Sequence, residues 1–292
     1  MSTSTKQFAN ISVVPADTAG YEAIGACKNL KQRILTGVIA GAGFLALLLI
    51  GGWAYIGLLL VLALIGYYEF VRMNGLAWSH PAALTGSLAT LAIAWPWQLT
   101  GGEAPSLGSL MWWVMLILLV WTVLTKNKTT IDHAANLLLG AFYIGFGFSA
   151  MMDVRLMDEY GLLATFLAFG CIWSSDIGAY FFGRAFGRNK LWPAISPNKT
   201  IEGSIGGIIL SLAVAVLFAL LAPQFISMGQ ALAIGAVSAI AGQMGDLIQS
   251  AYKRIRGIKD TGSLLPGHGG VLDRCDSWLI VYPILVFTGL LT

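Results

Sequence analysis

Charged residues are scarce in this chain, and their scarcity restricts the class of protein. Only 11% of the 292 residues are Asp, Glu, Lys or Arg, whereas 57% are hydrophobic. A soluble globular domain typically has about 25% charged residues. So few charges cannot cover a globular surface of this size, and lipid must therefore be the solvent for much of the chain. The net charge of +3 is also too small to indicate a nucleic-acid partner.

Paired cysteines are also absent. Cys27, Cys171 and Cys275 are far apart and form no CxxC pair, which argues against a disulfide framework and against a zinc site. The first 25 residues are polar and lack the charged start and apolar run of a cleavable signal peptide. We interpret residues 1–33 as a polar cytoplasmic tail.

What the chain does contain is a series of apolar runs of bilayer-spanning length, which is about 17–25 residues for a helix. These runs predict an all-α polytopic membrane protein with about nine transmembrane helices. The third run contains Pro96, and the last run is short. The predicted spans are residues 34–51, 53–71, 82–98, 109–125, 135–152, 161–182, 204–222, 229–248 and 277–292.

The basic residues of this nine-span arrangement gather on one side of the membrane. All 17 Lys and Arg residues except Arg155 precede the first span or follow the second, fourth, sixth or eighth span. The positive-inside rule therefore predicts a cytoplasmic N-terminus and an external C-terminus.

Polar residues suited to chemistry are concentrated in the second half of the chain. The predicted cytoplasmic segments 183–203 and 249–276 are long and rich in Gly, Pro, Lys, Arg and Asp. We therefore predict a transmembrane scaffold of about five spans over residues 34–152 and a catalytic membrane domain over residues 153–292. Glu69, at the end of a span in the first half, is interpreted with the rest of that half as scaffold, lipid contact or a homodimer surface.

Four aspartates lie within the predicted spans or next to them. Asp176 falls inside a span, where a charge costs at least a few kcal/mol, so it should face the interior, a cavity or a metal. Asp273 and Asp276 have i, i+3 spacing, which places both on one helix face. A helix dipole would explain one Asp there, but not Asp246 at the same depth on a neighbouring span. These carboxylates predict a Mg²⁺ or Mn²⁺ site, with a purely structural hydrogen-bonding role as the alternative for Asp176.

The segment 249–276 combines these carboxylates with fixed positive charge and glycines, whose backbone amides can approach an anion closely. This combination predicts a metal–polyphosphate site. A lipid-headgroup patch would explain the basic residues but not the GHGG and DRCD motifs. His268 is interpreted as a hydrogen-bond donor to phosphate or backbone, with metal ligation as the alternative. The basic residues and glycines are Lys253, Arg254, Arg256, Lys259, Gly262, Gly267, Gly269 and Gly270.

The loop over residues 189–207 has a related character. Lys199 and Thr200 follow a proline turn, and three glycines follow Glu202. Two interpretations stay open: Thr200 or Ser204 caps the next helix, or the loop forms a second anion-binding element that faces the first. The glycines are Gly203, Gly206 and Gly207.

Together the two segments resemble the phosphatidate cytidylyltransferases, also called CDP-diacylglycerol synthases. The resemblance covers roughly residues 170–280. Cys275 stands where the family usually has an apolar residue or Thr, and we expect little effect because Cys behaves as a small hydrophobe. The family's C-terminal signature is matched by Ser250, Lys253-Arg254, Lys259-Asp260, Gly262, Leu265-Pro266, His268-Gly269-Gly270 and Asp273-Arg274-Cys275-Asp276. Upstream matches are Asp176, Ala179-Tyr180, Gly183-Arg184, Gly187, Ser196-Pro197, Lys199-Thr200, Glu202-Gly203, Gly206-Gly207 and Gly245-Asp246.

The resemblance implies transfer of a cytidylyl group from CTP to phosphatidic acid at the cytoplasmic face of a membrane, which we expect to be a bacterial inner membrane. The products would be CDP-diacylglycerol and pyrophosphate, and the partners would be CTP, phosphatidic acid and membrane lipid, with a homodimer left open. The lipid phosphate would be the nucleophile, and Mg²⁺ would be the cofactor, with room for a second cation.

The same resemblance implies roles for individual residues. The carboxylates implied to hold metal are Asp246, Asp273, Asp276 and, directly or through a ligand, Asp176. The basic residues implied in catalysis, together with Asp246, Asp273 and Asp276, are Lys253, Arg254 and Lys259. The residues implied in substrate binding are Ser196, Lys199, Thr200, His268, Gly269, Gly270 and Arg274.

Three other function classes are weighed against this one. The CDP-alcohol phosphotransferases are also membrane enzymes with Asp clusters, but their DG…AR…G…D…D stretch is absent here. A CTP-dependent polyprenol or phytol kinase would transfer a phosphoryl group to an alcohol and should then need a general base. An anion transporter would show inverted repeats and broken helices at mid-membrane depth, whereas here the two halves differ and the polar residues gather at one face.

Overall fold

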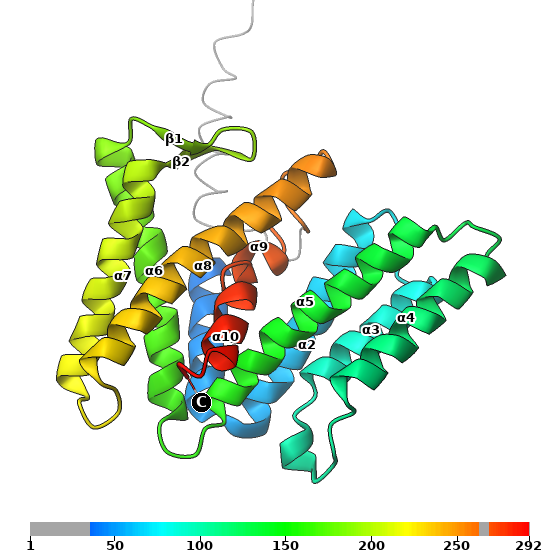
Figure 1. Cartoon of the computed structure of the whole chain (residues 1–292), viewed down its shortest axis with the longest axis horizontal. Helices are drawn as coiled ribbons and strands as arrows, with labels where there is room; N and C mark the ends of the chain where they lie inside the picture. The colour runs from blue at the N-terminus through cyan, green and yellow to red at the C-terminus, as the bar shows by residue number, and fades with distance from the viewer. Residues whose placement is uncertain (1–35, 263–268, 292) are drawn as a thin grey trace, which may run out of the picture.

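The computed structural model describes residues 36–262 and 269–291. Within these residues the protein is almost entirely helical, with one short antiparallel sheet of two strands (Figure 1). The predicted tail over residues 1–33 lies outside the described residues. The elements are a helix over Thr36–Ile50, then α2 (Gly52–Met73), α3 (Pro81–Ala94), the 3₁₀-helix η1 (Trp97–Thr100), α4 (Leu107–Leu124), α5 (Ile131–Arg155), α6 (Gly161–Phe186), β1 (Lys190–Trp192), β2 (Ser196–Thr200), α7 (Ile201–Leu221), α8 (Met228–Ile255), α9 (Leu272–Cys275) and α10 (Trp278–Phe287).

Apolar helices occur in the described residues at each of the nine predicted positions. Six of them, α2 and α4 to α8, are long and apolar enough to cross a membrane. The helix over Thr36–Ile50, α3 and α10 are shorter. In α3 the reason is local, because Trp95 precedes Pro96 and adopts an extended conformation with ψ 132°. The chain is therefore a multi-pass membrane protein, and nine complete spans remain a prediction.

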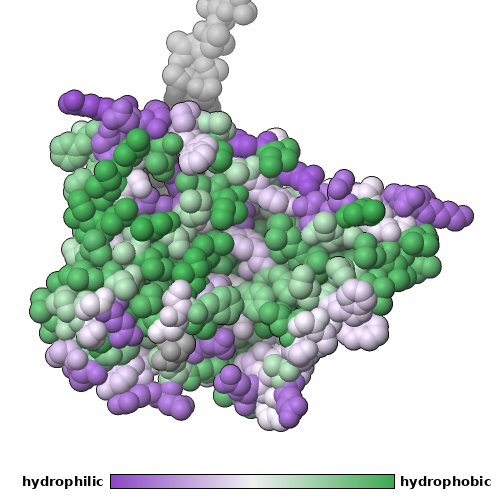
Figure 2. Space-filling model, in the orientation of Figure 1, coloured by the Kyte–Doolittle hydropathy of each residue, from purple (hydrophilic) through white to green (hydrophobic). Residues whose placement is uncertain are grey.

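The surface has the pattern expected of such a protein. In Figure 2, hydrophilic residues gather at the two ends of the molecule, and a broad hydrophobic region lies between them. Helix α4 is mostly exposed, and Trp112, Trp113 and Val123 on it are all more than half exposed. An exposed apolar face of this kind is expected to be covered by lipid or by another protein surface.

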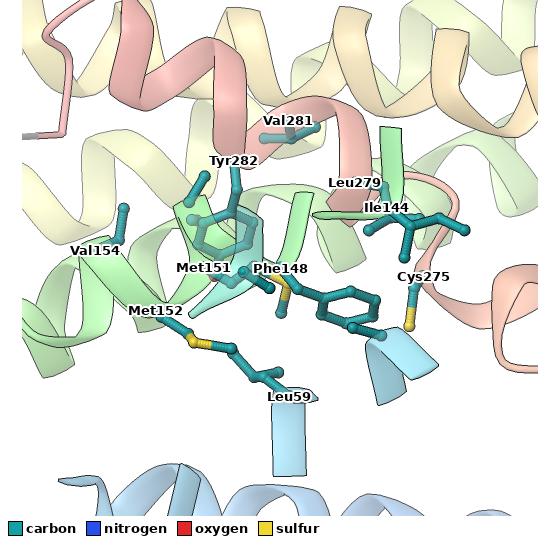
Figure 3. Packing of buried hydrophobic residues seen from close by; sticks show 14 of the residues in the cluster. Leu59, Ile144, Phe148, Met151, Met152, Val154, Cys275, Leu279, Val281 and Tyr282 are labelled. Carbon is teal, nitrogen blue, oxygen red and sulfur yellow. The ribbon is translucent and has the colours of Figure 1, made fainter. Parts of the chain in front are cut away.

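The helices form two groups joined by α10. Helices α6, α7 and α8 lie together below the β1–β2 hairpin, and α2 to α5 form the other group (Figure 1). Helix α10 packs against both α5 and α8. In Figure 3, side chains of α5 such as Phe148 and Met151 lie among those of the C-terminal segment, including Leu279 and Tyr282. The hydrophobic core thus ties the last helix to the first half of the chain.

Helices α6 and α7 approach each other backbone to backbone. A Cβ atom on Gly178 would lie 2.7 Å from the carbonyl oxygen of Gly206, and one on Gly203 would lie 2.7 Å from the carbonyl oxygen of Ala179. Small residues permit this close packing between helices in membranes. Gly203 and Gly206, which the sequence associated with a possible anion-binding loop, therefore serve helix packing.

Candidate active site

A cavity of about 1760 Å³ lies between the two groups of helices. One part of its wall is apolar and comes from the helix over Thr36–Ile50 and from α2, including Phe44 and Leu62. The other part is highly charged and comes from the second half of the chain. Its five acidic and five basic residues are Asp176, Asp246, Asp260, Asp273, Asp276, Arg184, Lys199, Lys253, Lys259 and Arg274.

Asp246 is held from two elements. The ammonium of Lys199, at the end of β2, lies 2.7 Å from Asp246 Oδ2. One helical turn along α8, the Ser250 hydroxyl donates to Asp246 Oδ1 at 3.2 Å. The hairpin therefore brings its lysine directly onto a carboxylate predicted from sequence to belong to the site.

Asp276 faces other carboxylates. Burial and the negative charges of Asp246 and Asp176 raise the pKa of Asp276 to about 7. The backbone N–H of Ser277 donates to Asp276 Oδ1 at 2.8 Å and lowers this pKa by a smaller amount. Asp176 itself is exposed and lines the cavity. These three aspartates come from α6, α8 and the turn before α10, and they form an acidic cluster in one cavity.

Asp273 has different partners, although it is only three residues from Asp276. Its Oδ1 accepts from Lys253 Nζ at 2.5 Å. Its Oδ2 accepts from the backbone N–H groups of Thr261 at 2.8 Å and Gly270 at 3.0 Å, and from the Thr261 hydroxyl at 3.0 Å. Burial raises the pKa of Asp273, but these hydrogen bonds and the charge of Lys253 outweigh it and leave the pKa below its ordinary value.

Among the described residues, no three His, Cys, Asp or Glu side chains are grouped closely enough to hold a metal ion as they stand. Asp176, Asp246 and Asp276 line the same cavity, and the ammonium of Lys199 is paired with the Asp246 carboxylate. Asp273 is separately paired with Lys253. The metal site expected from the sequence thus stays a prediction, and its carboxylates fall into two groups.

The structure brings most of the other predicted site residues to the cavity. Lys259, Arg274, Gly269 and Thr200 line it. Thr200 is also the N-cap of α7, because its hydroxyl accepts from the Gly203 N–H at 3.1 Å. The capping interpretation is therefore confirmed, and a role in substrate binding stays open.

Three predicted residues that the structure describes do not line the cavity. Arg254 is exposed and donates to the carbonyl oxygen of Ile195 in the hairpin at 3.3 Å. Ser196 pairs with Trp192 across the hairpin. Gly270 is buried and donates its backbone N–H to Asp273 Oδ2. His268 lies outside the described residues.

One residue central to the arrangement was missed by sequence reasoning. Glu69, interpreted as part of the scaffold half, is buried and accepts hydrogen bonds from Thr261, Val271 and Leu272. The signal in the sequence was a single carboxylate near the end of an otherwise apolar span, because a carboxylate at that depth needs hydrogen-bond or ionic partners. Its partners lie about 200 positions further along the chain, and no local pattern indicates them.

Cys275 behaves as expected from the sequence. It is 2% exposed and belongs to the hydrophobic core, and Figure 3 shows it in the same region as Ile144 and Phe148. Its side chain therefore packs as a small hydrophobe.

Taken together, the fold and the cavity define a membrane protein with a cavity whose wall is partly apolar and partly lined by acidic and basic side chains. The chain matches the cytidylyltransferase family over residues 31–291, so it belongs to that family and is an enzyme. Among its relatives, the phosphatidate cytidylyltransferase of Bacillus subtilis (strain 168) is 42% identical over 261 residues, which is 89% of this chain and 97% of the relative. That of Staphylococcus haemolyticus (strain JCSC1435) is 40% identical over 258 residues, 88% of this chain and 97% of the relative. The family resemblance inferred from the motifs is confirmed.

Proposed function

We propose that this enzyme transfers the cytidylyl group of CTP to phosphatidic acid, forming CDP-diacylglycerol and pyrophosphate. The observation that carries the proposal is a single cavity with a charged wall and an apolar wall. The nucleotide and the lipid phosphate would lie against the charged wall, and the acyl chains against Phe44, Leu62 and their neighbours. The names of the relatives support the same reaction.

The charge balance of the cavity favours a divalent cation. Its five acidic and five basic residues cancel, and Lys199 and Lys253 are already paired with carboxylates. Two phosphate-bearing substrates therefore need further positive charge. The acidic cluster fits a hard cation such as Mg²⁺, because it offers carboxylate oxygens from three elements. Burial and the neighbouring charges of Asp246 and Asp176 raise the pKa of Asp276 to about 7, and a cation would relieve this cost of ionisation.

We assign Asp246 and Asp276 to this cation, with Asp176 as a ligand or as a partner of one. Asp273 would join them by exchanging Lys253 for a cation, and the same cavity leaves room for a second cation. A bound Mg²⁺ would neutralise developing charge on the phosphates and orient them for reaction.

The reaction needs no nucleophile from the protein. An anionic phosphate oxygen of the lipid attacks the α-phosphorus of CTP. A new P–O bond forms, the bond between the α-phosphorus and the bridging oxygen breaks, and pyrophosphate leaves with the electron pair. The attack is in line, so positioning and charge neutralisation supply most of the catalysis.

The basic residues would supply that neutralisation. Lys199 and Lys253 would exchange their carboxylates for phosphate oxygens as substrates bind, and Lys259 and Arg274 would contact the triphosphate. Arg254, which lies outside the cavity and contacts the hairpin, would act on the site by orienting β1 and β2. The remaining residues assigned to the nucleotide or lipid phosphate are Ser196, Thr200, His268, Gly269 and Gly270.

The orientation in the membrane follows the positive-inside rule. We propose nine membrane helices, a cytoplasmic N-terminus, an external C-terminus and an active site that faces the cytoplasm of a bacterial cell. The bacterial sources of the relatives support this location. The first half of the chain offers the surface for a homodimer.

The test is a lipid-labelling assay with purified enzyme in detergent. Phosphatidic acid, Mg²⁺ and CTP labelled in the cytosine ring should give label in the lipid phase, and EDTA or replacement of CTP by ATP should abolish it. Asp276→Asn should lose Mg²⁺-dependent turnover, and full retention would refute the metal assignment. If no lipid is labelled while a known cytidylyltransferase works alongside, γ-labelled CTP with polyprenols tests the kinase alternative.

A further inference from the structure

Glu69 lies near the C-terminal end of α2 and is only 3% exposed. Its Oε1 accepts from the Val271 N–H at 2.9 Å, and its Oε2 accepts from the Leu272 N–H and the Thr261 hydroxyl, each at 3.0 Å. Neither of the two ion pairs found among the described residues includes Glu69. The carboxylate is thus held by hydrogen-bond donors from the segment that carries the family signature.

Two signature glycines leave room for this carboxylate. A Cβ atom on Gly262 or Gly270 would collide with the Glu69 side chain. From the sequence, these glycines were expected to let backbone amides approach an anion. In the structure, the anion that they admit is the protein's own carboxylate.

The contacts of Glu69 continue to the cavity through Thr261. The Thr261 hydroxyl lies 3.0 Å from both Glu69 Oε2 and Asp273 Oδ2, and Asp273 in turn pairs with Lys253 at 2.5 Å. Val271 and Leu272, the other partners of Glu69, begin the turn of α9 that leads directly to Asp276. Glu69 therefore contacts Thr261, which lies in the connection after α8, and Val271 and Leu272 at the start of α9.

We propose that Glu69 is a positioning residue for the active site, a role that rests on the proposed function. It holds the signature segment so that Asp273 keeps Lys253 in the cavity wall and Asp276 faces Asp246. Its chemistry is specific, because its two carboxylate oxygens accept from the backbone N–H groups of Val271 and Leu272 and from the Thr261 hydroxyl, whose single proton is shared with Asp273. In Glu69→Gln the amide NH₂ would face a backbone N–H or the Thr261 hydroxyl, so a donor would be left without an acceptor.

The experiment compares Glu69→Gln with a control on the same helix, Tyr67→Phe. Tyr67 is buried and donates to the carbonyl oxygen of Leu137 at 3.1 Å, so its loss weakens the fold without touching the signature segment. For each variant we would measure hydrogen–deuterium exchange of the peptide over residues 270–276 and the shift in unfolding temperature caused by Mg²⁺ without substrate. We would also measure the Mg²⁺ concentration for half-maximal activity, and kcat and KM for CTP.

Glu69→Gln should speed amide exchange in residues 270–276 and reduce the Mg²⁺-induced shift in unfolding temperature. It should also raise the Mg²⁺ concentration for half-maximal activity by about 10-fold or more, as is typical for loss of a group that orients ligands. The kcat should fall more than KM for CTP changes. Tyr67→Phe should lower the unfolding temperature and leave exchange in 270–276 and the Mg²⁺ response at wild-type values. Thr261→Val, which removes only the shared hydroxyl, should move every readout in the direction of Glu69→Gln by a smaller amount.

Wild-type exchange over residues 270–276 in Glu69→Gln would overturn the proposal, whatever the activity. Faster exchange with an unchanged Mg²⁺ response and unchanged kcat would also overturn it, because Glu69 would then serve only the fold. If the wild-type enzyme makes no lipid product from CTP, the proposed function fails separately. Exchange and the substrate-free Mg²⁺ shift still test Glu69 in that case.

Discussion

The pair formed by Lys253 and Asp273 permits a quantitative test of how the site is held together. The two side chains are only 13% and 9% exposed and lie 2.5 Å apart. Lys253→Met keeps most of the side-chain volume but leaves Asp273 with only hydrogen-bond donors from Thr261 and Gly270. Loss of a hydrogen bond to a charged group costs about 1.5–3 kcal/mol, and breaking a buried ion pair costs about 3–5 kcal/mol, so we expect about 3 kcal/mol.

The second half of the test removes the charge that Lys253→Met leaves behind. Asp273→Asn alone should cost about 2–3 kcal/mol, because its amide NH₂ faces donors that the carboxylate accepts from. The double variant has neither charge, so its loss of stability should be smaller than the sum of the two single losses by about 1–3 kcal/mol. All three variants should lose turnover on the order of 100-fold, since they lack the lysine proposed to bind phosphate, or the carboxylate paired with it, or both.

Unfolding in detergent, followed by tryptophan fluorescence, and the lipid-labelling assay measure the two effects. Lys253→Met should lower the unfolding temperature by roughly 5–10 °C. Lys190, on the exposed face of β1, has no carboxylate partner among the residues that the structure describes. Lys190→Met removes the same charge and should change stability by less than about 0.5 kcal/mol. Additive losses in the double variant, within about 0.5 kcal/mol, would refute the coupling.

Three further predictions follow from the site and its frame. The pKa of Asp276 is raised to about 7, so ionising it without a cation costs folding stability, and stability should fall as pH rises from about 4 toward 7. The Mg²⁺-induced rise in unfolding temperature should therefore be larger at pH 8 than at pH 6, and Asp276→Asn should remove this difference. Equal Mg²⁺-induced shifts at the two pH values in the wild type would contradict the prediction. Gly178→Ala places a Cβ atom 2.7 Å from the carbonyl oxygen of Gly206 and should cost about 1–3 kcal/mol of stability, measured by thermal unfolding. The control Gly57→Ala, whose Cβ atom would have nothing within 4 Å, should be neutral or stabilising by up to about 1 kcal/mol. An equal loss of stability in both variants would exclude close packing as the cause. Thr200→Ala should cost about 1 kcal/mol through loss of the α7 cap, and Thr200→Ser should restore stability; a Ser variant as unstable as Ala would argue against the cap.

Hydropathy predicted the helices well, because apolar length is a local property. All nine expected positions contain an apolar helix in the described residues. The ends were predicted less well: α6 continues to Phe186 and α8 to Ile255, beyond the predicted 182 and 248. Helical hydrogen bonds do not stop where the apolar run stops, so polar residues can extend a membrane helix. The β1–β2 hairpin was expected only as a polar loop, since its strands of three and five residues are too short for an alternating pattern.

The sequence by itself determined the class of the protein and the inventory of its site. Low charge and long apolar runs require a membrane protein, and the signature indicated Asp176, Asp246, Asp276 and Lys199, which the structure brings to one cavity. Only the tertiary structure decided how these groups are paired. It joins Lys199 to Asp246 and Lys253 to Asp273, and it gives Glu69 partners about 200 residues away. Such pairings depend on how separate helices pack against one another, and a chain read one local window at a time carries no signal for contacts across that distance.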